Sequence, residues 1–237
     1  ALLAAHLEEF LAGKREFDLL FEPTERKSLA GFSTTLHTII LNELDNVKTR
    51  LYVLRHDGTT WTRTPIPGLP EFGSTSASSV DGYLSDDYFL TTTDFLTPSS
   101  LFLGTAGGDT PEKLKQSPSF FDANGLQVSQ HEAVSKDGTR IPYFEVARAD
   151  LRADGTAPTQ LTGYGGFEVS NTPYYSGVTG SGWLANGGVL VVANIRGGGE
   201  FGPRWHQAAL KANRPRAYED FIAVAEDLIQ RKVTSPK

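Results

Sequence analysis

The chain has 237 residues, a net charge of −6 and 39% hydrophobic residues, as expected for one large globular domain or parts of two. The acidic balance argues against a nucleic-acid partner, and no apolar run approaches the ~20 residues that a membrane span needs. Because the sequence contains no cysteine, disulfides, thiolate metal sites and a cysteine nucleophile are excluded.

The first predicted element is a short helix within residues 2–14, where apolar side chains recur at helical spacing, and the alternative is a frayed terminal segment. Glutamates interrupt its apolar part and no basic region precedes it, so the segment is not a signal peptide. We expect a cytoplasmic protein, with the periplasm as the alternative location. The sequence contains no methionine and stops soon after a helix-like segment, so we expect a piece of a longer protein.

Residues 17–149 have the sequence pattern of an all-β region, in which short apolar-rich runs alternate with turn residues about every ten residues. Asp57-Gly58 and Asp137-Gly138 lie between facing runs and predict tight hairpin turns. Such spacing is typical of a sandwich, barrel or propeller, and the length would give about three four-stranded propeller blades. The expected strands are Phe17–Phe21, Thr34–Leu41, Arg50–Arg55, Thr59–Thr64, Thr75–Val80, Tyr88–Thr93, Ser100–Gly104, Gln127–Val134 and Thr139–Ala147.

A surface connection is predicted for residues 105–120, which are rich in glycine, aspartate and proline and then polar. Toward the C-terminus the order becomes strand, helix, strand, helix, which predicts an α/β domain. The boundary is placed between Gln127 and Arg140, giving domains of residues 1–130 and 131–237. The expected elements are a strand at 159–163, a loop and short helix within 174–186, a strand at 188–195, a helix from Pro203 to Leu210 and an amphipathic helix at 216–232.

One continuous apolar run, Val189–Ala193, stands out in this second part. A run without polar alternation is buried on both faces, as a parallel strand of an α/β sheet would be. Glycine-rich turns at 163–167 and 197–202 each follow a strand candidate, and so lie at the carboxyl edge of the predicted sheet. This is the edge at which α/β sheets bind ligands and place catalytic groups.

The turn Gly197–Gly202 fits the pattern G-x-G-x-x-G after a buried strand, with Glu219 and Asp220 about twenty residues further on. On pattern alone this is a dinucleotide-binding motif, whose glycines let the backbone approach a pyrophosphate. Against it, Glu200 would place a carboxylate beside the phosphates, and the two acidic residues lie within a helix. The alternative is a structural turn that needs positive φ angles and close packing.

The turn Gly163-Tyr164-Gly165-Gly166-Phe167 is the second candidate site. Its glycines would let the backbone swing the tyrosine hydroxyl and the phenylalanine ring over the sheet edge. In acyl transfer a hydroxyl donor can stabilise an oxyanion, and an aromatic ring can wall a specificity pocket. The α/β-hydrolases carry an oxyanion motif at a comparable place, after an early strand. The alternative is an aromatic side chain that packs under a glycine turn.

No nucleophile is recognisable, because the G-x-S-x-G elbow of hydrolases occurs nowhere in the sequence. No aspartate or histidine can be placed as a triad partner, so a hydrolase mechanism needs residues beyond Lys237. His206, near the second glycine turn, is a candidate base or, alternatively, a histidine on a helix surface. The five histidines are too far apart for a local metal motif, and we expect no metal.

Several segments together resemble the prolyl oligopeptidase family of serine peptidases, over roughly residues 127–237. The stretch Asn194-Ile195-Arg196-Gly197-Gly198-Gly199-Glu200 is the most specific of them. The β-rich part before them is compatible with the family's propeller. The other matching segments are Ser135–Pro142, Tyr164–Phe167, Asn171–Ser176, Gly187–Leu190, Ala193–Gly202, Trp205-His206 and Asp220–Lys237.

The resemblance implies a serine peptidase that cleaves short peptides, typically after proline. It also implies a fold, a β-propeller portion followed by the first part of an α/β-hydrolase domain. By motif, Tyr164 would donate its hydroxyl to the oxyanion hole, and Phe167 would line the pocket for the residue before the cut. The Gly197–Gly199 turn would be structural, and no cofactor is implied. The Tyr-Gly-Gly-Phe context is similar to the proline-specific branch rather than to the basic-residue-specific oligopeptidases.

In the family, the nucleophile motif Gly-Gly-Ser-Asn-Gly-Gly would begin a few residues after Lys237, with the Asp and His of the triad beyond it. We therefore expect the chain to be truncated before the nucleophile elbow and inactive by itself. Its partners would be short peptide substrates and the remainder of the same polypeptide, with no nucleic acid and no membrane.

Two alternatives to this peptidase stay open at this point. A nucleotide-dependent oxidoreductase would use the Gly197–Gly202 turn and would be stabilised by NAD(P). A non-catalytic β-rich binding module would have no hydrolase elbow further along its gene.

Overall fold

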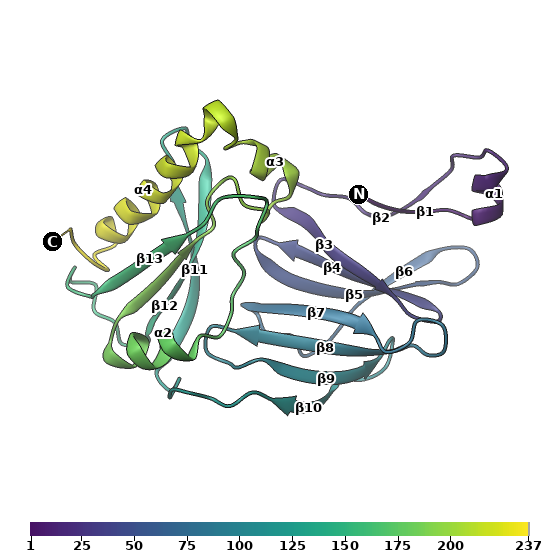
Figure 1. Cartoon of the computed structure of the whole chain (residues 1–237), viewed down its shortest axis with the longest axis horizontal. Coiled ribbons are helices and arrows are strands. Elements are labelled where there is room, and N and C mark those ends of the chain that lie inside the picture. Colours follow the sequence, from purple (N-terminus) through teal and green to yellow (C-terminus); the bar gives the residue numbers. More distant parts are fainter. Residues whose placement is uncertain (237) are drawn as a thin grey trace.

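The structure is a computed structural model that describes residues 1–236, so Lys237, where the resemblance ends, lies outside the described residues. A β-rich part and an α/β part lie side by side (Figure 1). The strands are β1 (Leu2–Ala4), β2 (Asp18–Phe21), β3 (Lys27–Thr34), β4 (Thr38–Asp45), β5 (Lys48–His56), β6 (Trp61–Pro65), β7 (Gly73–Ser79), β8 (Asp87–Asp94), β9 (Ser100–Thr105), β10 (Glu112–Gln116), β11 (Leu126–Val134), β12 (Arg140–Arg148), β13 (Thr159–Gly163) and β14 (Val189–Ala193). The helices are α1 (Leu7–Leu11), α2 (Gly177–Gly182), α3 (Pro203–Gln207) and α4 (Pro215–Gln230), with short 3-10 helices at Leu184–Asn186 and Lys211–Asn213.

Two four-stranded antiparallel sheets form most of the β-rich part, with the orders β3-β4-β5-β6 and β10-β9-β8-β7. Each sheet is a meander of consecutive strands, as in a propeller blade. β1 and β2 form a separate two-stranded sheet. The prediction of about three blades is therefore wrong. In the described part of the chain, β1 and β2 pair only with each other, and β11 and β12 belong to a different sheet.

The helix predicted within residues 2–14 forms only at Leu7–Leu11. Leu2–Ala4 are extended instead, because they pair with β2 in an antiparallel ladder. The spacing of apolar residues along a short segment does not report a strand partner that is distant in sequence. This part of the prediction is therefore wrong.

The expected strand Thr34–Leu41 is also wrong, because a tight turn separates β3 from β4 within it. The Thr35 N–H donates to the Thr38 carbonyl at 2.9 Å. The Asp86 carboxylate accepts from the Thr35 hydroxyl at 2.7 Å and from the His37 N–H at 2.8 Å. Asp86 directly precedes β8 of the neighbouring sheet, so the local sequence does not show the group that fixes this turn.

Residues 105–120, expected as a surface connection, contain the edge strand β10. All of its residues are exposed, so it lacks the apolar alternation that marks a half-buried strand. The extended conformation of β10 is stabilised by its pairing with β9. By contrast, the expected strand Thr75–Val80, which is mostly serine and threonine, is confirmed as β7.

The α/β part is built on a mixed sheet with the order β11-β12-β14-β13. β13 and β14 run parallel, whereas β12 pairs antiparallel with β11 and β14. The run Val189–Ala193 forms the inner strand β14, and the prediction of a buried parallel strand is confirmed. The division of the chain at residues 130 and 131 stays a prediction, while the sheet itself begins at Leu126.

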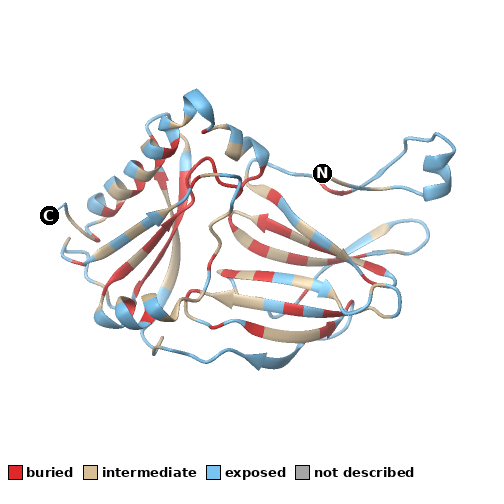
Figure 2. Ribbon diagram, viewed as in Figure 1, coloured by how far each residue is buried: buried red, intermediate tan, exposed pale blue. Residues whose placement is uncertain are grey.

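The mixed sheet lies between two layers, and buried residues run along its inner strands (Figure 2). One face packs on α4 through a core that includes Tyr143 and Val224. The other face packs on the β-rich part, where Phe144 and Val192 meet Phe95. The ring centroids of Phe95 and Phe144 are 5.6 Å apart. The sheet therefore packs directly against the β-rich part, and this contact places its carboxyl edge beside that part.

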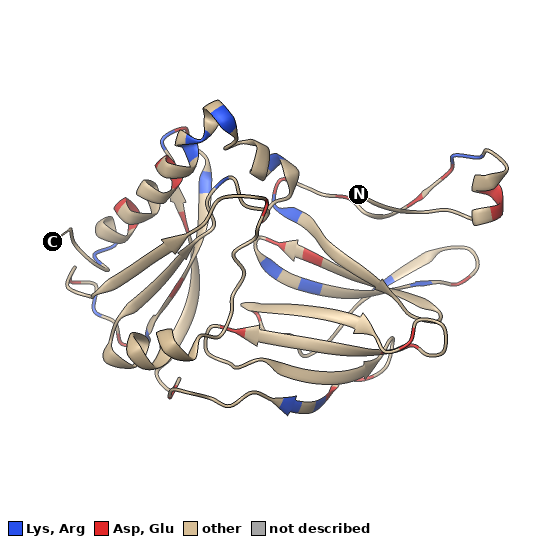
Figure 3. Cartoon of the chain, in the orientation of Figure 1, with Lys and Arg blue, Asp and Glu red and all other residues tan. Residues whose placement is uncertain are grey.

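Charged residues are spread unevenly over the chain (Figure 3). Several lie along α4, whereas β7 and β9 contain none. The exposed side of α4 carries charged residues such as Arg216 and Glu226, but also the exposed apolar side chains of Tyr218, Ile222 and Ile229. Among residues 1–236, no helix has the length and apolar character needed to cross a membrane.

A polar cluster fastens the C-terminal end of α4 to the sheet. The Tyr143 hydroxyl donates to the Asp227 carboxylate and accepts from the Arg231 guanidinium at 2.8 Å. Arg231 also donates to the Glu145 carboxylate at 2.7 Å and lies 3.2 Å from His131 Nε2. Burial and then the charge of Arg231 lower the pKa of His131, because both disfavour the imidazolium. The carboxylates of Glu145 and Asp227 act in the opposite direction and do not reverse the shift.

Stability should therefore fall at acidic pH through His131. Its folded-state pKa lies below the unfolded value of about 6.5, so the unfolded state binds the proton first. The stabilising contribution is complete above about pH 6.5 and is lost as the pH falls through the folded-state pKa. His131→Asn should flatten the fall of Tm below about pH 6.5, whereas His6→Asn, at an exposed histidine, should not. Thermal unfolding across that range measures the slopes, and equal slopes in both variants would contradict the assignment.

Candidate active site

Two glycine-rich loops leave the carboxyl edges of the parallel strands β13 and β14, as predicted. Residues 164–173 follow β13, and residues 194–202 follow β14. Tyr164 is the first residue after β13 and is 50% exposed, while Phe167 is 85% exposed. Their ring centroids are 6.4 Å apart, with an angle of 27° between the rings. The structure thus brings the two predicted site residues together on one loop.

The two loops touch backbone to backbone, and this contact explains their glycines. A Cβ atom at Gly197 would lie 2.3 Å from the Gly165 carbonyl oxygen. A Cβ atom at Gly199 would lie 2.1 Å from the Glu168 carbonyl oxygen. Gly165 itself has a φ of +58°, and its Cβ atom would lie 2.5 Å from the Ile195 side chain. Larger residues at these positions would push the loops apart, so the glycine spacing reflects their close approach.

The residues present do not fit a dinucleotide at this turn. The backbone approach that the motif offers to a pyrophosphate is occupied by the loop of residues 164–173. α3, which follows the turn, has only five residues. The Asp220 carboxylate, the candidate for binding a ribose, is buried against Arg196 instead. The geometry therefore agrees with the structural interpretation of Gly197–Gly202.

Arg196 joins the second loop to two distant segments. Its side chain is 4% exposed, and its guanidinium lies 2.6 Å from the Asp220 carboxylate and 2.5 Å from the Asp137 carboxylate. The Ser135 hydroxyl donates to Asp220 at 2.7 Å, and the Arg196 N–H donates to the same carboxylate at 3.0 Å. The hydrogen bond from Arg196 holds the pKa of Asp137 well below its usual range. These contacts fix the end of β14 relative to α4 and the β11–β12 turn.

Glu200 is a fully buried carboxyl group between the loops. Its Oε1 accepts the Asn171 N–H at 2.9 Å and an Asn194 side-chain N–H at 3.2 Å. Burial raises the pKa of Glu200, and these hydrogen bonds offset only part of the rise. Its carbonyl accepts the Ser28 hydroxyl of β3 at 3.0 Å. From the sequence, Glu200 was an argument against a phosphate site and part of the family resemblance, but its role as a buried anchor between the loops was not predicted.

His206 lies between the two loops. Its Nδ1 is 2.6 Å from the Gly197 carbonyl oxygen and 3.1 Å from the Glu168 backbone nitrogen. With the proton on Nδ1 the ring donates to Gly197, and in the other tautomer it accepts from Glu168. In the tautomer without a proton on Nδ1, the imidazole links α3 to the loop of residues 164–173, a role that neither expectation, a base or a surface histidine, described.

Tyr164 lines a cavity of about 450 Å³ between the sheet edge and the β-rich part. Ser74 of β7 and Thr93 of β8 line its other side. Further along the loop, Ser170 and Thr172 line both this cavity and a larger one of about 910 Å³. The loop that carries Tyr164 therefore borders two neighbouring cavities between the two folds.

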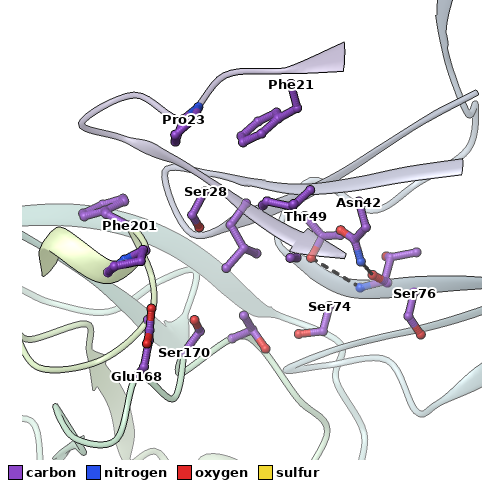
Figure 4. A pocket seen from close by; sticks show the side chains of 18 of the residues that line it. Phe21, Pro23, Ser28, Asn42, Thr49, Ser74, Ser76, Glu168, Ser170 and Phe201 are labelled. Atoms are coloured by element: carbon purple, nitrogen blue, oxygen red, sulfur yellow. Dashed lines mark hydrogen bonds between the residues drawn. The ribbon is translucent and has the colours of Figure 1, made fainter. Parts of the chain in front are cut away.

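The larger cavity is lined by hydroxyl-bearing and aromatic side chains from several elements (Figure 4). Ser74 and Phe21 reach it from the β-rich part, whereas Glu168, Ser170 and Phe201 reach it from the two loops. Cavities of this volume are typical of sites that bind drug-sized ligands. Among residues 1–236, no three His, Asp or Glu side chains are grouped as metal ligands would be.

Comparison with known proteins relates this arrangement to one family. The family model described as the prolyl oligopeptidase family matches residues 176–237. An uncharacterized peptidase of Sinorhizobium fredii is 46% identical over 237 residues, which cover 99% of this chain and 32% of that protein. A prolyl endopeptidase of Elizabethkingia meningoseptica is 35% identical over 164 residues, which cover 69% of this chain and 23% of that protein.

Solved structures agree with these relatives. A post-proline cleaving enzyme from Rickettsia typhi matches with a TM-score of 0.83 at 34% identity, covering 95% of this chain and 32% of that chain. Oligopeptidase B from Leishmania major matches with a TM-score of 0.78 at 22% identity, a likeness of fold alone. This chain spans about a third of the length of the relatives it matches. The chain therefore belongs to the prolyl oligopeptidase family, and its two parts are a portion of a β-propeller and the first part of an α/β-hydrolase domain.

Proposed function

We propose that this chain is part of a serine-type endopeptidase that cleaves short peptides after proline through an acyl-enzyme. The observation that carries the proposal is the position of Tyr164, half exposed, directly after β13 and lining a cavity between the two folds. A hydroxyl in this position can donate to a peptide carbonyl oxygen as that oxygen becomes negative. Relatives named prolyl endopeptidase and post-proline cleaving enzyme support the choice of cleavage site.

Phe167 would form one wall of the pocket for the residue before the cut. Its ring is 85% exposed, a large apolar surface that a bound substrate would cover. The ring lies beside that of Tyr164, so a proline held against Phe167 would bring its carbonyl toward the tyrosine hydroxyl. In this proposal the loop supplies both the specificity wall and the oxyanion donor.

The nucleophile and its Asp and His partners would come from a longer polypeptide that includes this chain, because no G-x-S-x-G elbow is present. β13 lies at the edge of the mixed sheet, and Tyr218 and Ile222 of α4 are more than half exposed. The remainder of the same polypeptide would cover this edge and these side chains, since an open strand edge pairs readily with another segment. The cytoplasm stays the proposed location.

A fluorophosphonate probe tests the proposal, because it labels activated serine nucleophiles. The full-length gene product should be labelled and should hydrolyse a short peptide after proline. The same product denatured before labelling is the control and should not react. These 237 residues expressed alone should also stay unlabelled. Labelling of these residues alone, or a folded full-length product with neither labelling nor peptidase activity, would overturn the proposal.

A further inference from the structure

The loop that carries Tyr164 has an unusual backbone. Gly165, Phe167 and Glu168 have φ angles of +58°, +52° and +57°, in the left-handed region. Phe167 and Glu168 are not glycines, so their conformation is strained and persists only where neighbouring groups hold it. The position of the Tyr164 side chain therefore depends on the groups that fix this loop.

Separate contacts hold two positions of the loop. In its middle, the Glu168 backbone nitrogen lies 3.3 Å from the Gly197 carbonyl oxygen and 3.1 Å from His206 Nδ1. Near its start, the Arg214 guanidinium donates to the Gly165 carbonyl. Because these contacts come from different segments, each can be removed without removing the other.

Arg214 is oriented toward the junction of the loops by its surroundings. It directly precedes α4, and its guanidinium lies 5.4 Å from the centroid of the Tyr218 ring, as in a cation–π contact. A Cβ atom at Gly197 would lie 3.0 Å from Arg214 Nη1. The guanidinium therefore lies at the contact between the loop of residues 164–173 and the loop of residues 194–202.

We propose that Arg214 is a positioning residue, which fixes the Tyr164 hydroxyl by holding the carbonyl of Gly165. This proposal rests on the proposed role of Tyr164 as an oxyanion donor. Gly165 is the next residue after Tyr164, and a charge-assisted hydrogen bond restrains its carbonyl more strongly than a neutral one would. A misplacement of about 1 Å at a catalytic group can cost on the order of 100-fold in rate, so this restraint acts on catalysis.

Arg214→Ala in the full-length peptidase should lower kcat roughly 10-fold on a short proline-containing peptide. KM should change less, because the end of the loop beyond Phe167 keeps its contact with His206. Arg214→Lys restores a cation without the planar fork and should recover part of the lost kcat. Arg216→Ala is the matched control, since its guanidinium donates to the Ala208 carbonyl at 3.2 Å on the surface, and it should keep the wild-type kcat.

A double-mutant cycle with Tyr164→Phe separates this inference from the proposed function. If Arg214 acts through the tyrosine hydroxyl, Arg214→Ala should have little further effect on kcat in the Tyr164→Phe background. Multiplicative losses, or a wild-type kcat for Arg214→Ala, would overturn the positioning role and leave the oxyanion role standing. A wild-type kcat for Tyr164→Phe would instead overturn the oxyanion role itself. If thermal unfolding shows that Arg214→Ala does not fold, Arg214→Gln carries the same cycle.

Discussion

Replacing Tyr164 with phenylalanine in the full-length peptidase should lower kcat by roughly 10- to 1000-fold, the range for losing one oxyanion donor. The change removes only a hydroxyl from a side chain that is 50% exposed, so the fold and the ring contact with Phe167 should persist. The lost hydrogen bond is stronger to the charged tetrahedral intermediate than to the neutral carbonyl of the substrate. KM should therefore change little, and initial rates on a short proline-containing peptide measure both constants.

Tyr174→Phe is the matched control for this experiment. Tyr174 is 61% exposed and lines the same cavity as Tyr164, but it does not follow the carboxyl end of a strand. Loss of the Tyr174 hydroxyl should leave kcat within about twofold of the wild-type value. Equal losses in the two variants would point to a general disturbance of the cavity. An unchanged kcat for Tyr164→Phe would remove this tyrosine from the mechanism.

The α/β part of the fold could be predicted because its signals are local and strong. The apolar run Val189–Ala193 and the amphipathic helix expected at 216–232 are observed as β14 and α4. The fully exposed strand β10 has no such signal in its sequence. Its extended conformation is stabilised by pairing with β9. The turn between β3 and β4 likewise depends on Asp86, which directly precedes β8 of the neighbouring sheet.

The glycine spacing and the family resemblance were enough to single out Tyr164 and Phe167, whose chemical roles stay predictions. The groups that hold their loop could not be found in the same way. The contact of Glu200 with Asn171 spans 29 positions, and that of Arg214 with Gly165 spans 49. Spacing within one motif carries no information about such contacts, which arise only when the two loops meet.

These contacts connect α4 to the loop of residues 164–173 along two routes. Arg196 binds Asp220 of α4 and belongs to the loop on which Gly165 rests. Arg214, just before α4, holds the Gly165 carbonyl directly. The position of Tyr164 thus depends on the packing of α4 against the sheet, and the buried ion pair of Arg196 and Asp220 stabilises much of that contact.

Asp220→Asn should lower the free energy of unfolding by about 3 kcal/mol, because it breaks a buried ion pair and leaves the charge of Arg196 with only the partly exposed Asp137 as a partner. The Asp220 side chain is 0% exposed and the Arg196 side chain 4%, so water cannot replace the lost carboxylate. Asparagine has nearly the same shape, which separates the loss of charge from the creation of a cavity. Urea unfolding followed by the fluorescence of Trp183 and Trp205, which pack on the α/β sheet, measures the change.

Asp137→Asn supplies the control at the same arginine. The Asp137 side chain is 38% exposed, so solvent screens its pairing with Arg196 and its loss should cost less than about 1 kcal/mol. A larger cost for Asp137→Asn than for Asp220→Asn would mean that the pairing on the β11–β12 turn, rather than the one on α4, holds the sheet edge. In that case α4 would not be the element that keeps the Tyr164 loop in place, and the route from α4 through Arg196 would have to be abandoned.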